Sequence, residues 1–201
     1  VKESTDPDVA REIKEAITKS ERKNDNTGMT ILNLSKTFRT GKRSSAQDCR
    51  ALDMFTGYCD GNSVFSILGH NGAGKTTAIN ILTGVIPSSY GDAFIMGKSI
   101  ITSMDEIQDS IGVCPQEDVI WPGLTGREHM RIFCMLKGIP RSEIELEVTT
   151  KASKVGLTKY LDRQAEKYSG GMKRRLSVAI AMIGDPKVIF LDEPTSGLDP
   201  A

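Results

Sequence analysis

Short apolar runs, separated by turns rich in glycine and proline, make up the first half of the chain. Runs with the alternating or clustered apolar pattern of β-strands occur at residues 30–34, 51–55, 64–68, 90–97 and 111–116. The run at 64–68 is continuously apolar, which predicts a short buried strand. A glycine-rich loop follows it, and residues 77–82 then place Ile79 and Leu82 on one face of a predicted helix.

The second half of the chain has a largely helical pattern. The segments 125–128 and 142–145 each have the form of a capping box, which predicts a helix start at both. Ser169 begins a third predicted helix, and the apolar run 187–191 predicts a strand buried in a parallel sheet. We therefore expect a helical lobe, at about residues 118–167, inserted into an α/β core.

Charge and cysteine content limit the classes of partner. Lysine plus arginine and aspartate plus glutamate both number 26, so the net charge is zero. This balance does not favour a nucleic-acid partner, because phosphate backbones attract clustered positive charge. The four cysteines form no Cys-x-x-Cys pair, which indicates reduced thiols of a cytosolic domain. No apolar run approaches the ~18 residues that cross a bilayer.

A phosphate-binding pattern lies between the predicted strand and the first predicted helix. Residues 69–77 match G-x-x-x-x-G-K-[ST] at every required position. Glycines let successive backbone N–H groups turn toward phosphate oxygens, and the helix N-terminus adds partial positive charge. Lys75 would reach the outer phosphates and the Thr76 hydroxyl would ligate Mg²⁺, which predicts a nucleotide site.

Two carboxylates, Asp192 and Glu193, directly follow the predicted strand at 187–191. They would lie at the C-terminal edge of a parallel sheet, where open α/β sheets bind their ligands. One carboxylate there can hold Mg²⁺, directly or through water, and the other can deprotonate an attacking water. Gln116, which follows another predicted strand, offers a neutral side chain to metal or water.

The segment Tyr-Ser-Gly-Gly-Met at residues 168–172 forms a second candidate for anion binding at a helix start. Ser169 can cap the helix, and the two glycines expose backbone N–H groups. The phosphate loop already has such a helix, so a second one is surplus within a single molecule. The surplus suggests a site that two copies share.

Taken together, these stretches resemble the nucleotide-binding domain of an ABC transporter. The matching motifs are the Walker A loop at 69–77, the Q-loop at Gln116, the signature at 168–172, the Walker B strand and its glutamate at 188–193, and the D-loop at 196–199. The sequences of these motifs are most similar to those of the A subfamily, the eukaryotic transporters associated with lipids. The resemblance implies a P-loop NTPase core, with a RecA-like parallel sheet, an antiparallel β lobe and the inserted helical lobe, truncated at the C-terminus.

The resemblance also implies a role for each site residue. Phe38 would stack on adenine, at a position that the family more often fills with tyrosine. The other residues implied to bind ATP are Gly69, Asn71, Gly72, Ala73, Gly74, Lys75, Thr76 and Thr77. The residues implied to serve Mg²⁺ are Thr76, Gln116 and Asp192. Glu193 would be the general base, with Gln116 beside it in catalysis. The signature residues implied to contact the ATP of an opposite domain are Ser169, Gly170, Gly171 and Met172, and Asp199 belongs to the D-loop.

The implied function is an ATPase that dimerises with a second nucleotide-binding domain around ATP and drives transport through a transmembrane domain. The substrate would be lipid, and the parent would be a multi-pass membrane protein with this domain on the cytosolic face. The lobe surface from Gln116 onward, including Trp121, would receive the transmembrane domain, although Trp121 fits the lobe core equally well. The alternative is a soluble ABC ATPase acting on ribosomes or nucleic acid, which the neutral charge and the A-subfamily wording disfavour.

Residues 1–28 are charged and suit either a connector helix or a frayed terminal segment, and residues 29–201 would form the nucleotide-binding domain. Tyr168 replaces the usual signature leucine, which we expect to be tolerated because both side chains are large and largely apolar. The chain ends before the family's switch histidine, for which neither His70 nor His129 can substitute. We therefore expect this piece alone to be a weak ATPase.

Overall fold

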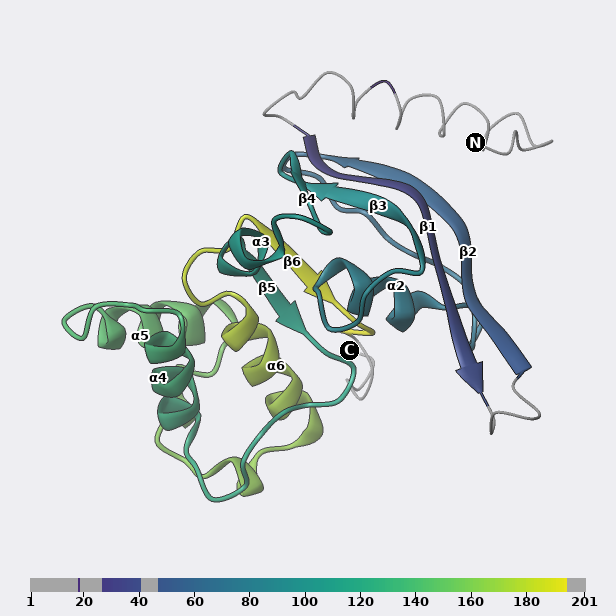
Figure 1. Ribbon diagram of the computed structural model, residues 1–201. Helices are drawn as coiled ribbons and strands as arrows, with labels where there is room; N and C mark the ends of the chain where they lie inside the picture. The colour runs from purple at the N-terminus through teal and green to yellow at the C-terminus, as the bar shows by residue number, and fades with distance from the viewer. Residues whose placement is uncertain (1–17, 19–26, 41–46, 195–201) are drawn as a thin grey trace. The chain divides into compact units, whose positions relative to one another are not determined.

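The computed structural model of the chain describes Thr18, residues 27–40 and residues 47–194. It contains two compact units, which divide after Gln108. The first unit is built on an antiparallel sheet, and the second on a parallel strand pair with helices (Figure 1). Most of the expected connector at 1–28 and the D-loop residue Asp199 lie outside the described residues.

The sheet of the first unit has the strand order β2-β1-β3-β4. Its strands are β1 (Thr27–Thr40), β2 (Gln47–Asp60), β3 (Tyr90–Ile95) and β4 (Lys98–Ser99). Both β1 and β3 contribute side chains to the core, where Ile31, Leu34 and Ile95 are fully buried. The strands predicted in these three regions of the chain are confirmed.

Two helices accompany this sheet. Helix α2 (Lys75–Leu82) confirms the prediction made from residues 77–82 and buries Ile81 and Leu82. Gly84 follows the C-cap Thr83, and its φ of +79° lies in the left-handed region that favours glycine. Met104 begins helix α3 (Met104–Ser110).

The strand predicted at residues 64–68 is wrong. In the described structure these residues have no regular secondary structure, and Val64 and Leu68 are 93% and 89% exposed. The apolar run indicates burial, but a strand also needs a neighbour that satisfies its backbone hydrogen bonds. The described sheet of the first unit, with β2 at one edge and β4 at the other, includes no partner for this run.

A parallel strand pair positions the site of the second unit. Strand β5 (Ile111–Cys114) pairs in parallel with β6 (Val188–Leu191), and their C-terminal residues Cys114 and Leu191 are partners. Both strands are predicted from the sequence, but the expected burial of the second is only partly correct, because Ile189 and Leu191 are exposed and Phe190 is buried. Because the two parallel strands end at paired residues, the segments that follow them lie at the same end of the strand pair. Helix α6 (Gly170–Ala181) packs on β5 at Gly112, where an added Cβ would lie 1.9 Å from the carbonyl oxygen of Ala181.

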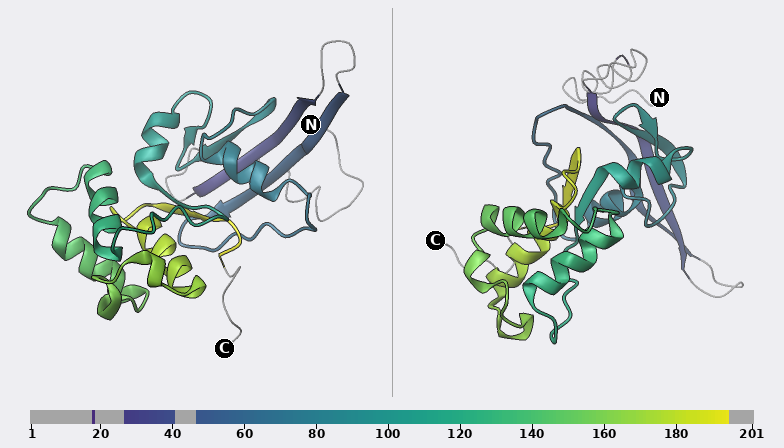
Figure 2. Two further views of the ribbon diagram at one scale, coloured as in Figure 1. Left: turned by 90° about the horizontal axis from the view of Figure 1, so that it is seen from below. Right: turned by 90° about the vertical axis from the view of Figure 1, so that its left-hand side faces the viewer.

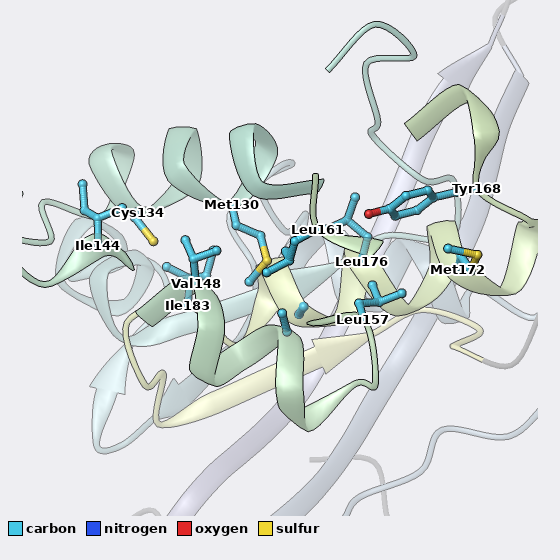
Figure 3. Packing of buried hydrophobic residues seen from close by; sticks show 12 residues of the cluster. Met130, Cys134, Ile144, Val148, Leu157, Leu161, Tyr168, Met172, Leu176 and Ile183 are labelled. Carbon is cyan, nitrogen blue, oxygen red and sulfur yellow. The ribbon is translucent and has the colours of Figure 1, made fainter. Parts of the chain in front are cut away.

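Helices α4 (Gly126–Leu136) and α5 (Ile144–Lys154) pack against α6 and against each other. The three helices gather in one group in both views of Figure 2. Their apolar faces meet in a core that includes Met130, Val148, Leu157, Leu161 and Leu176, each at most 1% exposed (Figure 3). Two short 3-10 turns, η1 (Thr158–Tyr160) and η2 (Ala165–Lys167), carry the chain from α5 to α6.

One of the two predicted capping boxes is confirmed and the other is wrong. The Thr125 side chain accepts a hydrogen bond from the Glu128 backbone N–H, and the Glu128 carboxylate accepts one from the backbone N–H of Thr125. At α5, the N-cap is Glu143, which makes no side-chain cap hydrogen bond. The backbone N–H of Glu143 donates to the carbonyl of Pro140, so a turn precedes the helix and Ser142 lies inside this turn.

Candidate nucleotide-binding site

The phosphate loop ends at two glycines that the backbone requires. Gly72 and Gly74 have φ values of +84° and +90°, and a Cβ at Gly74 would lie 2.3 Å from the carbonyl oxygen of Ala51. Only glycine fits such a position without displacing β2. The Gly74 carbonyl then accepts the first hydrogen bond of α2, from the Ala78 N–H, at 2.8 Å.

The start of α2 suits an anion. Its N-cap Gly74 provides no side-chain cap, and its first turn holds no acidic residue. The first backbone N–H groups of this helix therefore lack the side-chain acceptor that usually satisfies them. The Lys75 ammonium lies over the same loop, donating to the carbonyls of Gly69 at 2.9 Å and His70 at 3.1 Å. The loop thus fits the phosphates of a nucleotide.

The candidate adenine contact, Phe38, lies on β1 and is 39% exposed. The Lys36 ammonium lies 5.2 Å from the centre of its ring, within the range of a cation–π contact, and donates to the Pro87 carbonyl at 2.6 Å. The ring is therefore held in place and keeps an accessible surface on which a base can stack.

The second unit brings Gln116, Asp192 and Glu193 together at the C-terminal edge of the β5-β6 pair. The Gln116 amide donates to the Glu193 carboxylate, with 3.0 Å between Nε2 and Oε2. Asp192 is buried, and its backbone N–H donates to the Cys114 carbonyl at 2.9 Å. Glu193 has a φ of +46°, in the left-handed region that non-glycine residues rarely adopt. Such backbone strain gathers at functional sites, because the surrounding structure must hold it.

The signature segment begins α6 in the way the sequence predicts. The Ser169 hydroxyl accepts a hydrogen bond from the Met172 N–H at 3.3 Å, and the first turn of the helix holds no acidic residue. Tyr168, just before the cap, is buried, and its hydroxyl donates to the Tyr160 carbonyl at 2.7 Å. A tyrosine at this position therefore adds a specific hydrogen bond to the apolar bulk that a leucine would supply.

Sequence reasoning missed Arg174, which is 2% exposed. Its side chain contacts both the turn that follows β5 and the turn that follows β6. A signal for its burial was present in the pattern of α6. Arg174, Ser177 and Ala181 are spaced as one face of a helix, and the two residues that accompany the arginine are small. A stripe of small residues leaves room for a packed strand and for a long polar side chain.

Trp121 and His129 form a structural pair in the lobe. The Trp121 backbone N–H donates to His129 Nε2 at 2.9 Å, and His129 Nδ1 lies 2.7 Å from the Thr125 carbonyl. The Trp121 ring stacks on His129 and Phe133 while remaining 45% exposed. His129 itself is fully buried. Trp121 therefore combines a place in the lobe packing with an accessible surface.

The candidate Mg²⁺ ligands are oxygen donors. Within the described part of the chain, no group of three or more His, Cys, Asp or Glu side chains could hold a metal ion. Mg²⁺ usually binds through one or two protein groups together with substrate phosphates and water. In the first unit the hydroxyl of Thr76, and in the second unit the side chains of Gln116 and Asp192, are each oxygen donors of this kind.

Among the described helices, none has both the length and the hydropathy needed to pass through a lipid bilayer.

Comparison with known families and proteins gives a consistent result. The family model described as ABC transporter matches residues 52–196. ABC transporter A family member 2 of Arabidopsis thaliana is 53% identical over 141 residues, which cover 69% of this chain and 14% of that protein. ABC transporter A family member 8 of the same plant is 43% identical over 206 residues, which cover 100% of this chain and 22% of that protein. ATP-binding cassette sub-family A member 7 of Rattus norvegicus is 41% identical over 196 residues, covering 98% and 9%.

Two solved structures share the fold. A dimeric ATP-binding cassette in a post-hydrolysis state, bound to ADP and Pi, matches with a TM-score of 0.75 at 23% identity, covering 85% of this chain and 76% of that one. A dimeric bacterial ABC transporter cassette matches with the same TM-score and coverage at 24% identity. The predicted fold class, that of an ABC ATPase cassette, is confirmed. The chain spans between 9% and 22% of the length of the three relatives named above.

Proposed function

The chain belongs to the ABC transporter family and has the fold of an ABC ATPase cassette, and from this premise we propose that it binds ATP with Mg²⁺ and hydrolyses the terminal phosphate bond. The observation that carries the proposal is the meeting of Gln116 and Glu193 at the ends of two parallel strands. A carboxylate fixed there, next to an amide, suits the task of orienting a water and taking its proton.

Each group of the chain has a separate role in the proposed reaction. The N–H groups at the start of α2 and the Lys75 ammonium bind the phosphates and stabilise the charge that develops during transfer. Thr76, Gln116 and Asp192 are the residues that would hold Mg²⁺, which when bound would neutralise charge on the phosphate oxygens. Glu193 accepts the proton of the attacking water, and Phe38 supports the adenine ring.

The start of α6 has no role in the ATP site of its own chain under this proposal. Its N–H groups and the Ser169 to Met172 segment bind the terminal phosphate of ATP held by a second nucleotide-binding domain. The dimeric state of both structural relatives supports such a partner. Asp199 of the D-loop, which lies outside the described residues, is proposed to lie at the same interface.

At the level of the parent protein, we expect a transmembrane domain as the second partner, with this cassette on the cytosolic face of a membrane. The transporter names of the relatives support this view. Lipid is the proposed transported class, on the resemblance of the motifs to the A subfamily. The lobe around Trp121 is the proposed contact with the membrane domain. The net charge of zero gives no support to the alternative, a soluble cassette acting on nucleic acid.

The proposed base is tested with Glu193→Gln in the full-length protein. The substitution keeps the size of the side chain and removes its ability to accept a proton, so hydrolysis should fall by about 100-fold to 10,000-fold. The affinity for ATP should stay within about threefold, because binding rests on the phosphate loop. The matched control is Glu166→Gln, an exposed glutamate of the same unit that should leave hydrolysis unchanged. Undiminished turnover by Glu193→Gln would reject Glu193 as the base.

A further inference from the structure

Arg174 is a charged side chain buried where three parts of the second unit meet. It projects from α6, and only 2% of its surface is exposed. A buried guanidinium is costly unless its N–H groups find acceptors, and here all three of its nitrogens donate. The acceptors are backbone carbonyls of the segments that follow β5 and β6, together with one carboxylate.

Two hydrogen bonds from Arg174 to the turn that follows β6 lie on both sides of Glu193. Nη2 of Arg174 donates to the Asp192 carbonyl, and Nε donates to the Pro194 carbonyl at 3.2 Å. Glu193, between these two residues, has the left-handed φ of +46°. A residue in that conformation keeps it only where its surroundings impose it, and the two hydrogen bonds of Arg174 fix the peptide groups on either side.

The remaining nitrogen holds the turn that carries Gln116. Nη1 donates to the Pro115 carbonyl at 2.5 Å and lies 3.4 Å from both the Gln116 carbonyl and the Asp118 carboxylate. Asp118 is itself fixed by the Ser177 hydroxyl, one turn further along α6, at 2.7 Å. One planar guanidinium thus joins both turns, and across them the Gln116 amide meets the Glu193 carboxylate at 3.0 Å.

We propose that Arg174 is a positioning residue for hydrolysis: it sets the separation and orientation of Gln116 and Glu193 and ties both to the helix that begins at the signature. The inference rests on the proposed function, since it gives Arg174 a task in the same reaction. The fork of the guanidinium is essential, because several donors in fixed directions reach the two turns at once. A lysine ammonium, which is a single point of charge on a flexible stem, can serve one turn but not both.

The experiment measures steady-state ATP hydrolysis by the full-length protein carrying Arg174→Met or Arg174→Lys. A displacement of about 1 Å at a reacting group can cost about 100-fold, so we expect kcat to fall by roughly 10-fold to 100-fold. The KM for ATP should stay within about threefold, because the phosphate loop is untouched. Arg174→Lys keeps the positive charge and serves as the test if Arg174→Met does not fold.

The matched control is Arg175→Met, which removes the same charge from the next position of α6. Arg175 is exposed, and among the described residues it donates to the carbonyls of Gly171 and Val155 and to neither of the turns that carry Gln116 and Glu193, so the kcat of this variant should match that of the unsubstituted protein. A second readout is the combination of Arg174→Lys with Gln116→Ala. If Arg174 acts through this pair, the two losses in kcat should combine to much less than their product.

Three results would separate the possibilities. A folded Arg174 variant with unchanged kcat, or losses that multiply fully with Gln116→Ala, would overturn the positioning role while leaving the ATPase intact. A large rise in KM without a change in kcat would overturn it as well, since that pattern marks a role in binding. If the unsubstituted protein and Arg175→Met both lack hydrolysis, the proposed function itself fails, and this inference falls with it.

Discussion

The hydroxyl of Tyr168 and the absent side chain of Gly126 are coupled in space. A Cβ added at Gly126 would lie 2.4 Å from that hydroxyl oxygen, far inside normal contact. Its next neighbours, the Tyr168 ring carbon Cζ at 3.4 Å and the Leu161 carbonyl oxygen at 3.5 Å, are ordinary contacts. The effect of Gly126→Ala should therefore depend on whether the hydroxyl is present, and Tyr168→Phe removes it.

The expected magnitudes follow from three separate effects. Tyr168→Phe loses one hydrogen bond to the Tyr160 carbonyl, which keeps a second from the Arg163 N–H, so the cost should be about 0.5–1.5 kcal/mol. Gly126→Ala alone adds overpacking of about 1–3 kcal/mol. Gly126 is the first residue of α4, so the ~0.5–1 kcal/mol that alanine gains over glycine in a helix interior is an upper bound on the offset. With Tyr168→Phe already present, the overpacking is removed and Gly126→Ala should cost nothing.

The assay is urea unfolding of the 201-residue chain, followed by the fluorescence of its single tryptophan. Trp121 lies in the same lobe and stacks on His129, with the ring centres 5.5 Å apart, so its signal reports this region. The four proteins of the cycle should show a coupling of about 1–3 kcal/mol between the two sites. Additive effects, within about 0.5 kcal/mol, would refute the steric coupling of Gly126 and Tyr168.

Two further predictions concern ionisable groups of the second unit. Burial raises the pKa of Cys134 to about 11 and also raises the pKa of Cys114. Iodoacetamide at pH 8 should therefore label the exposed Cys49 long before either buried thiol. Peptide mass spectrometry of the labelled native protein measures this, and equal labelling of the three cysteines would contradict it. Hydrogen bonds from Arg127 and Lys151 lower the pKa of Asp162 and Asp185, so the stability they add is present above the ordinary carboxyl pKa of about 4 and is lost as the pH falls through the lower folded values. The urea midpoint should hold from pH 7 to 5 and fall below about pH 4, and Asp162→Asn should reduce that fall.

Local signals in the sequence predicted the elements of the fold well. The capping box at Thr125 and the cap at Ser169 depend on residues within one helical turn, so they can be recognised without tertiary structure. Ser142 has the same local form, yet the turn begun at Pro140 places it ahead of the helix start. Whether a cap forms thus depends on how the preceding chain enters the helix, which the pattern alone does not specify.

Signals that need a partner were harder to interpret. The apolar run 64–68 indicates burial, but the sheet described in its own unit does not pair with it. Tyr168 was judged by size and polarity, whereas its hydroxyl donates to a carbonyl eight positions earlier in the chain. Both cases turn on a specific neighbour in space. The composition of the sequence and its hydrophobic periodicity do not identify such neighbours.

The candidate site shows the same division between chemistry and support. Residues with distinctive chemistry, such as Lys75, Asp192 and Glu193, stand in recognisable motifs and could be singled out from sequence. Arg174 belongs to the support, because its donors serve backbone carbonyls that any residue type would present. No sequence motif can mark such acceptors, so its role emerges only when the strand ends are placed side by side.

Helix α6 connects these supports in a single element. It begins at the Ser169 cap, reaches the turns of Gln116 and Glu193 through Arg174, and ends where the Ala181 carbonyl approaches Gly112 of β5. A helix fixed at its start, along its length and at its end moves as one body, since its own hydrogen bonds resist internal change. The signature and the proposed catalytic pair therefore lie on one mechanical unit. A substitution that loosens the helix should therefore lower kcat, because it changes the separation of Gln116 and Glu193. Its effect on the affinity for ATP should be smaller.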